Sequence, residues 1–408
     1  MELNTDIVDI YFFGSPRQIF MDILKGNQNL YYIFTSTVIG FIAWDNYVSM
    51  AVLLPVIWAQ ATTKKTAYLI GLGYHLAASR GLIVGIPVFF GSNDFYGIFL
   101  WLLAGFIQAI PYFLCSYIRN TYLAIFILLV ALILPPICII GWVNPLTAAG
   151  MIFPGTGFFG LFLTLDLIWL MTWQYKNKLF LTVLILFLIV FPLVVEQTAT
   201  STPDIKGTIT KFSGNPANIG DKFSKDYEKF ITTYNQFGGS DFKVLVLPES
   251  TAGIWFDSTK NLWGKWQRNL KEGQGVVLST LLPDGKGAME AYNTLILMTK
   301  NEFKVLYMAR QSVPVAMWKP WSNDNVKTNW FESPIFEIND KKATALICYE
   351  AYLTWPILHS FIVDDPETIL FVSNHWWSKN TSLLSIQKTC VQSWANLFNV
   401  QLISAVNL

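Results

Sequence analysis

Two side chains that could perform acid–base and nucleophilic chemistry follow short apolar runs in the second half of the chain. Glu249 comes after residues 242–247 and Pro248, and Cys348 comes directly after residues 345–347. Such runs predict buried strands, and strand ends of α/β folds commonly carry active sites. A buried carboxylate can become a working base, and a cysteine thiolate is a nucleophile. The pattern predicts that Cys348 forms a thioester with Glu249 as base, although either residue alone is also typical of a structural role.

The elements that must position this pair form a sheet-rich α/β domain. Residues 197–223 are rich in proline, glycine and polar residues and predict a linker or first irregular strand, so the domain would span residues 197–408. Strands outnumber helices in this half, which predicts a sheet covered by helices. Further strand-like runs lie at residues 276–282, 293–298, 304–309, 343–348, 367–373 and 401–406, and helix-like stretches at 258–271 and 381–398.

The first half of the chain has the composition of a membrane domain. The 408 residues are 53% hydrophobic and only 13% charged, with a mean hydropathy of +0.41. A transmembrane helix needs about 20 mostly apolar residues, and seven aromatic-rich segments approach this length. We therefore expect a polytopic α-helical membrane domain over residues 1–196. The seven segments lie near residues 30–44, 47–62, 67–90, 95–117, 121–143, 157–174 and 178–196.

The basic residues between these segments predict the orientation of the chain. They all fall in alternate connections, whereas the loops at 92–94 and 144–156 contain no lysine or arginine. By the positive-inside rule the basic connections are cytoplasmic, and no cleavable signal peptide is evident in the first 29 residues. We expect a bacterial inner-membrane protein with a cytoplasmic N-terminus and a periplasmic α/β domain. The basic residues are Arg17, Lys25, Lys64, Lys65, Arg119, Lys176 and Lys178.

Charge, histidines and cysteines exclude several other classes. The formal net charge of +1 gives no reason to expect direct nucleic-acid binding. His75, His359 and His375 are scattered, so we expect no metal site, and no motif indicates a cofactor. Cys348 and Cys390 fall on the oxidising side of the membrane. A disulfide between them is the alternative to a reactive thiol, because it would block chemistry at Cys348.

Three motifs together resemble the nitrilase superfamily. Pro248-Glu249, Cys348-Tyr349-Glu350 and Phe-Val-Ser-Asn-His-Trp-Trp-Ser at residues 371–378 occur in the order seen in its amidases and acyltransferases. With seven upstream spans, residues 30–408 look like apolipoprotein N-acyltransferase. The resemblance implies an αββα sandwich and a Glu-Lys-Cys triad that moves an acyl group from a phospholipid to a protein amine. It assigns the general base to Glu249, the nucleophile to Cys348 and a supporting carboxylate to Glu350.

The lysine of that triad is missing from its place in the motif. Aligning residues 307–317 on their Val-Pro pair puts Ala309 at the lysine position. Arg310 is one residue away, which in a regular strand turns its side chain to the opposite face, unless a bulge or strand end restores it. An arginine could stabilise an oxyanion, so Arg310 completes the expected catalytic set. Lys304 and Lys319 are further candidates, with a solvated surface position as the alternative for each.

Three further side chains are expected to bind substrate. Arg80 lies inside an apolar segment, where a charge costs about 2.5 to 3.5 kcal/mol on insertion scales, so it needs a partner such as Asp166 or a wet cavity. The alternative is a shifted span with Arg80 at the interface. Trp376 and Trp377 could form a lid where lipid acyl chains enter, and ordinary core packing is the alternative.

Residues 73–81 and 312–321 resemble plasmid conjugal transfer proteins of the TraB type, relatives of the acyltransferase. The chain also stops at Leu408, where the acyltransferase would continue into an eighth span. Two functions follow. The first is a membrane-embedded cysteine acyltransferase or amidase associated with conjugal transfer, which takes an acyl group from a phospholipid or other donor to a protein amine. The second is a non-catalytic envelope component of a conjugation apparatus whose triad has decayed, as Ala309 suggests.

Overall fold

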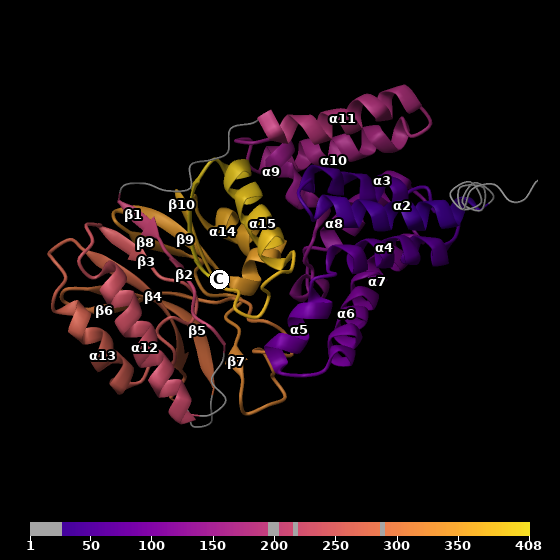
Figure 1. Ribbon diagram of the computed structural model, residues 1–408. Coiled ribbons are helices and arrows are strands. Elements are labelled where there is room, and N and C mark those ends of the chain that lie inside the picture. Colours follow the sequence, from indigo (N-terminus) through magenta and orange to yellow (C-terminus); the bar gives the residue numbers. More distant parts are fainter. Residues whose placement is uncertain (1–26, 195–203, 215–218, 286–289) are drawn as a thin grey trace, which may run out of the picture.

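The computed structural model describes residues 27–194, 204–214, 219–285 and 290–408, which form a helical region beside an α/β region (Figure 1). The basic residues Arg17 and Lys25 and parts of the expected linker, residues 197–203 and 215–218, lie outside the described residues. Elements of both regions surround the candidate catalytic residues.

Each apolar segment of the first half contains one or more helices. Asn27 caps the first of them by accepting a hydrogen bond from the Leu30 amide, and Thr63, Asn93 and Asn120 cap later helices in the same way. These helices are α2 (Gln28–Ala43), α3 (Leu53–Trp58), α4 (Lys64–Ala78), α5 (Leu82–Phe90), α6 (Asp94–Gln108), α7 (Ile110–Cys115), α8 (Thr121–Ala131), α9 (Ala149–Ile152), α10 (Phe158–Trp173) and α11 (Lys178–Val194), with short 3-10 turns at Val48–Val52, Ile137–Ile139 and Pro145–Ala148.

The lengths of these helices decide which could cross a bilayer. Within the described residues, Asp94–Cys115 is long and apolar enough, with a mean hydropathy of 2.0. The α4–α5 pair would add a second if its 59° bend is counted as one broken span. The other apolar helices of this region are shorter than the roughly 20 residues that a bilayer core requires. Seven spans therefore stay a prediction.

The second half folds into two packed sheets. In the first sheet the strand order is β1-β3-β4-β5-β6, with β7 paired to β5, and in the second it is β2-β11-β10-β9-β8. The first sheet contains β1 (Ile205–Gly207), β3 (Val244–Val246), β4 (Gly275–Pro283), β5 (Ala291–Thr299), β6 (Phe303–Met308) and β7 (Val326–Lys327). The second contains β2 (Ile209–Thr210), β8 (Ile335–Ile338), β9 (Lys341–Ile347), β10 (Thr368–Asn374) and β11 (Gln401–Asn407).

Alternation along the strands separates an inner core from two outer ones. Val244 and Val246 on β3 pack between the sheets against Ala345 of β9, whereas Leu245 points outward to the opposite face. Outside the first sheet lie α12 (Ile219–Phe237) and α13 (Asp257–Gln267), and outside the second lie α14 (Thr354–Val363) and α15 (Leu383–Phe398) (Figure 1). The layers are helix, sheet, sheet and helix, so the predicted αββα fold is confirmed.

Helix α15 joins the sandwich to the helical region. The backbone of Gly150 in α9 approaches the Ser393 carbonyl so closely that a Cβ atom has no room, and the Ser393 hydroxyl donates to the Thr147 carbonyl. The Tyr349 hydroxyl donates to the Ile139 carbonyl at 2.8 Å. The residues just after β9 therefore lie against the helical region.

Candidate active site

Polar side chains from four strands of the sandwich gather at one place between the sheets. Glu249 follows β3, Cys348 follows β9, Asn374 ends β10 and Asn293 lies on β5. Glu249 is 6% exposed and Cys348 is 8% exposed. Strand ends of both sheets therefore bring together an acid and a thiol that are far apart in the sequence, as the sequence predicted for active-site geometry.

The Glu249 carboxylate has polar neighbours on or just after three strands. Asn293 Nδ2 donates to its Oε1 atom at 2.8 Å, and the Cys348 thiol and the backbone N–H of Asn374 lie beside the carboxylate. Burial raises the pKa of Glu249 above its usual range, and these three neighbours offset part of that increase. A raised pKa brings the carboxylate closer to the value that a general base needs near neutral pH.

Cys348 follows β9 directly and is the first residue of a 3-10 helix (Cys348–Tyr352). The backbone of this turn is strained at Cys348. Its backbone φ is +46°, in the left-handed region, which for a residue other than glycine costs roughly 1–3 kcal/mol. Burial and the negative charge of Glu249 raise the pKa of the Cys348 thiol well above its usual range. The resting group is therefore a neutral thiol that lies beside the base that can take its proton.

A neutral network, defined as His375, Ser378 and Gln387, holds the carbonyl of this turn. Gln387 Nε2 donates to the Cys348 carbonyl at 2.6 Å, and Gln387 Oε1 lies 2.6 Å from His375 Nε2. His375 Nδ1 lies 2.6 Å from the Ser378 hydroxyl. Burial lowers the pKa of His375 to about 4, so its ring is neutral at neutral pH and Nε2 donates to Gln387.

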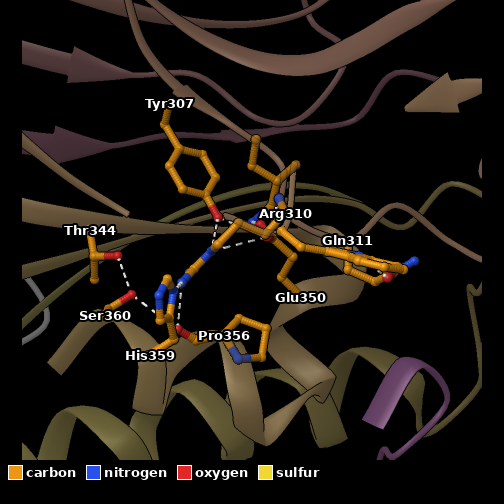
Figure 2. A network of polar contacts seen from close by, with 10 residues as sticks. Tyr307, Arg310, Gln311, Thr344, Glu350, Pro356, His359 and Ser360 are labelled. Atoms are coloured by element: carbon orange, nitrogen blue, oxygen red, sulfur yellow. Dashed lines mark hydrogen bonds and ion pairs between the residues drawn. The ribbon is translucent and has the colours of Figure 1, made fainter. Parts of the chain in front are cut away.

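A charged network, defined as Tyr307, Arg310 and Glu350, lies on the other side of the turn (Figure 2). Glu350 Oε2 accepts from the Ile347 amide at 2.9 Å, and Oε1 accepts from the Tyr307 hydroxyl at 2.7 Å and the Arg310 amide at 2.8 Å. The Arg310 guanidinium lies 3.7 Å from Glu350 Oε1 through Nε, and its Nη1 donates to the Pro356 carbonyl at 2.7 Å. Arg310 and Glu350 are both fully buried.

The cations expected from the sequence lie away from the thiol. Ala309, at the position of the family lysine, packs in the same core cluster as Cys348, whereas Arg310 turns toward Glu350 after β6 has ended. Lys319 pairs with Asp324 at 2.7 Å. Arg310 therefore lies beyond the end of the strand, where its guanidinium is paired with Glu350.

A lysine that the sequence gave no reason to select lines the entrance to the carboxylate. Glu249, Lys229, Asn374 and Trp376 line a narrow pocket of about 30 Å³. Lys229 comes from α12 and its Nζ donates to the Ser250 carbonyl at 3.4 Å. Lys229 belongs to an amphipathic helix and is not part of any sequence motif. Only the packing of α12 against the sandwich brings it to the pocket.

Two relatives that match nearly the whole chain are both conjugal transfer proteins by name. No family model matches the sequence. The chain is 30% identical over 400 residues to "Conjugal transfer protein TraB" of Agrobacterium fabrum, covering 92% of each chain. It is also 30% identical over 391 residues to "Probable conjugal transfer protein TraB" of Sinorhizobium fredii, covering 91% of this chain and 96% of the relative. The chain belongs to the TraB family of conjugal transfer proteins.

Solved structures similar to this TraB-family chain include two proteins of carbon–nitrogen chemistry. An amidase of the nitrilase superfamily from Nesterenkonia has 13% identity and a TM-score of 0.35, over 53% of this chain and 79% of the amidase. A carbon–nitrogen hydrolase from Helicobacter pylori G27 has 11% identity and a TM-score of 0.35, over 50% of this chain and 73% of the hydrolase. The TraB resemblance expected from the sequence is thus confirmed by the relatives of nearly full length.

The two tryptophans predicted to bind substrate connect the site of the TraB-family protein to α5. Trp376 lines the Glu249 pocket and stacks on Phe89, with ring centroids 6.1 Å apart. Trp377 contacts Phe89 at 5.7 Å and stacks on His375 at 6.3 Å. Both indoles therefore lie between the active-site loop and the helical region, and their part in substrate binding stays a prediction.

Arg80 lies in a separate, wider groove of about 500 Å³ between the α4–α5 bend and the start of α15. Its Nη2 atom pairs with Asp45 Oδ1 at 3.0 Å, so the partner is Asp45 and not Asp166 as the sequence suggested. The sequence could not rank these two acids, because α2 packs on α4 only in the folded protein. Ser382 and Ser385 of the TraB-family chain line the same groove.

The four cysteines of the TraB-family protein are all free thiols. The alternative of a Cys348–Cys390 disulfide is therefore wrong, since each sulfur is buried in a different setting, Cys348 beside Glu249 and Cys390 within α15. Within the described residues, no group of three or more histidine, cysteine, aspartate or glutamate side chains is arranged to hold a metal ion.

Proposed function

We propose that this protein is a membrane-embedded cysteine acyltransferase or amidase that serves conjugal transfer. The observation that carries the proposal is the position of the Cys348 thiol beside the buried Glu249 carboxylate, close enough for each group to shift the pKa of the other. A thiol beside a carboxylate of raised pKa has a base in place for its proton. The conjugal role is proposed from the two conjugal transfer proteins that match this chain over nearly its full length.

The reaction proceeds in two halves. Cys348 Sγ attacks an acyl carbonyl while its proton passes to Glu249, and the leaving group departs with that proton, leaving a thioester. An amine or water then gives a proton to Glu249 and attacks the thioester, and the sulfur leaves and recovers the proton. Lys229 supplies a positive charge near the oxyanion, in place of the lysine that the sequence lacks at Ala309.

The surface of the helical region supports placement in a bilayer. Large apolar side chains are exposed on several of its helices, including Phe95, Phe162, Trp173, Leu179 and Leu193. Exposed apolar surface on this scale is unfavourable in water and typical of contact with lipid. Residues 1–196 are accordingly proposed as a seven-span inner-membrane domain with a cytoplasmic N-terminus, and residues 197–408 as a periplasmic domain. A phospholipid is the proposed acyl donor and a protein amine the acceptor.

One observation favours a second function, a non-catalytic envelope component of the conjugation apparatus. Ala309 occupies the place of the lysine and is buried in the core, so no cation is held there against the thiol. In that case the sandwich would serve as a scaffold, and Glu249 and Cys348 would be remnants of an active ancestor.

Peptide mass spectrometry after lipid treatment distinguishes the two functions. The full-length protein in detergent is mixed with vesicles of phosphatidylethanolamine and phosphatidylglycerol, and peptides containing Cys348 and Cys390 are compared. We expect an acyl adduct on Cys348 that is lost in Glu249→Gln, while Cys390→Ala, a matched change of a buried thiol, leaves it intact. Full conjugation by a strain carrying Cys348→Ala, with no adduct on the wild-type protein, would establish the non-catalytic function.

A further inference from the structure

The turn that contains Cys348 is held in part by hydrogen bonds to one carboxylate, that of Glu350. Glu350 receives three donors: the amide of Ile347 just before Cys348, the hydroxyl of Tyr307 and the amide of Arg310. An ionised carboxylate only accepts hydrogen bonds, whereas a protonated one must itself donate. The three contacts therefore favour the negatively charged form of Glu350 inside the protein.

A buried charge of this kind needs a countercharge. Glu350 is fully buried, and burial raises its pKa while the Arg310 guanidinium is the first of the groups that lower it again. Without a cation nearby, the carboxylate would take up a proton more readily and lose one of its acceptor positions. Arg310 is therefore the group that keeps Glu350 in the form that the Cys348 turn requires.

Arg310 is itself fixed from several elements (Figure 2). Its Nε donates to the Tyr307 hydroxyl at 3.0 Å, and its Nη1 donates to the Pro356 carbonyl at 2.7 Å and lies 3.3 Å from His359 Nδ1. These contacts join the end of β6 to the first turn of α14. The guanidinium thus connects three elements around the strained residue without touching the sulfur.

We propose that Arg310 is a positioning residue: through Glu350 it holds the strained Cys348 turn, and so keeps the thiol beside Glu249. Its consequence for turnover rests on the proposed function. Its consequence for geometry does not, because the thiol and Glu249 face each other whether or not an acyl group is transferred.

The test measures how strongly position 249 controls the Cys348 thiol. The alkylation rate of Cys348 by iodoacetamide is followed across pH by peptide mass spectrometry on the full-length protein in detergent. In the wild-type background, Glu249→Gln removes the charge that suppresses the thiolate, and we expect a rise of about tenfold near pH 8, equivalent to one pKa unit. In the Arg310→Met background the same substitution is expected to change the rate less than threefold.

Arg310→Lys keeps the charge and loses the planar fork, so it should give an intermediate response. Lys342 lies on β9, the strand that ends just before Cys348, and Lys342→Met removes its half-exposed ion pair with Asp364, so this variant should leave the tenfold response unchanged. If Arg310→Met does not fold, the double variant Arg310→Met/Glu350→Gln removes both buried charges and takes its place. An undiminished tenfold response in a folded Arg310 variant would overturn the proposal, even if the protein were less stable. Loss of acylation alone would overturn the proposed function and not this inference.

Discussion

The two networks on either side of Cys348 hold the same turn by different means. The charged network binds the amide before the turn through Glu350, and the neutral network binds the carbonyl of Cys348 through Gln387. The first depends on an ion pair sealed from solvent, and the second on a histidine that must stay unprotonated. The comparison shows that one strained residue is held by two kinds of contact. The ion pair holds it through charge, and the neutral hydrogen bonds hold it only while His375 is unprotonated.

The two networks should also differ in energy. A net hydrogen bond between neutral groups contributes about 0.5–1.5 kcal/mol, whereas breaking a buried ion pair by removing one partner costs about 3–5 kcal/mol. We therefore expect the charged network to dominate stability and the neutral network to set the acid limit of the site.

The largest effect is expected from Glu350→Gln. This change keeps the size of the side chain and leaves the buried Arg310 charge unpaired, so the free energy of unfolding should fall by about 3–5 kcal/mol. Urea titration followed by tryptophan fluorescence measures it. Lys342→Met, which removes a half-exposed pair, serves as the control and should cost less than about 1 kcal/mol. Equal losses in the two variants would contradict the assigned role of burial.

The next effect is a dependence on pH. The pKa of His375 is lowered to about 4 in the fold, against about 6.5 when the chain is unfolded, so the unfolded chain binds the proton first. The contribution of His375 is complete above pH 6.5 and is lost as the pH falls toward 4, by about 3 kcal/mol in total. Urea titrations from pH 7 to pH 4 measure it, and His375→Gln should be flatter in that window. An identical slope in the variant would assign the acid sensitivity to other groups.

A smaller effect is expected from Gln387→Leu. The change leaves the Cys348 carbonyl and His375 Nε2 without partners, which should lower the free energy of unfolding by about 1–2 kcal/mol. The same denaturation experiment, run beside Glu350→Gln, ranks the two networks directly. A loss as large as that of Glu350→Gln would remove the energetic distinction between them.

The smallest effect on stability, and a separate one on chemistry, is expected from Lys229→Met. Lys229 lies outside both networks, and its contacts with Asp226 and the Ser250 carbonyl are long, so the free energy of unfolding of the variant should fall by less than about 1 kcal/mol. The rate of Cys348 acylation should fall about tenfold, because a charge near the oxyanion is lost. Unchanged acylation would remove Lys229 from the proposed mechanism.

The sequence predicted best those features of the protein that depend on a local pattern of residues. Apolar runs ending at Glu249 and Cys348 predicted the two strand ends that carry the acid and the thiol, the motif order predicted the sandwich, and residues 73–81 and 312–321 predicted the TraB resemblance. The sequence placed Arg310 in the catalytic set, whereas in the fold its guanidinium pairs with Glu350. It did not indicate Asn293 or Gln387, because a single amide on a strand or helix has no spacing signal.

The order of residues by itself determined the longer strands, such as β4, β5 and β10, and which side chains follow the strands that end before Glu249 and Cys348, since these depend on neighbours along the chain. It did not predict α14 or the short strands β7 and β8. Only the tertiary structure decided which side chains contact each other. It pairs Asp45 with Arg80 and Arg310 with Glu350, and it places Lys229 at the Glu249 pocket. The physical reason is that charge pairing and burial are set by the contact of elements distant in sequence. A pKa or an ion pair therefore appears only after those elements have packed.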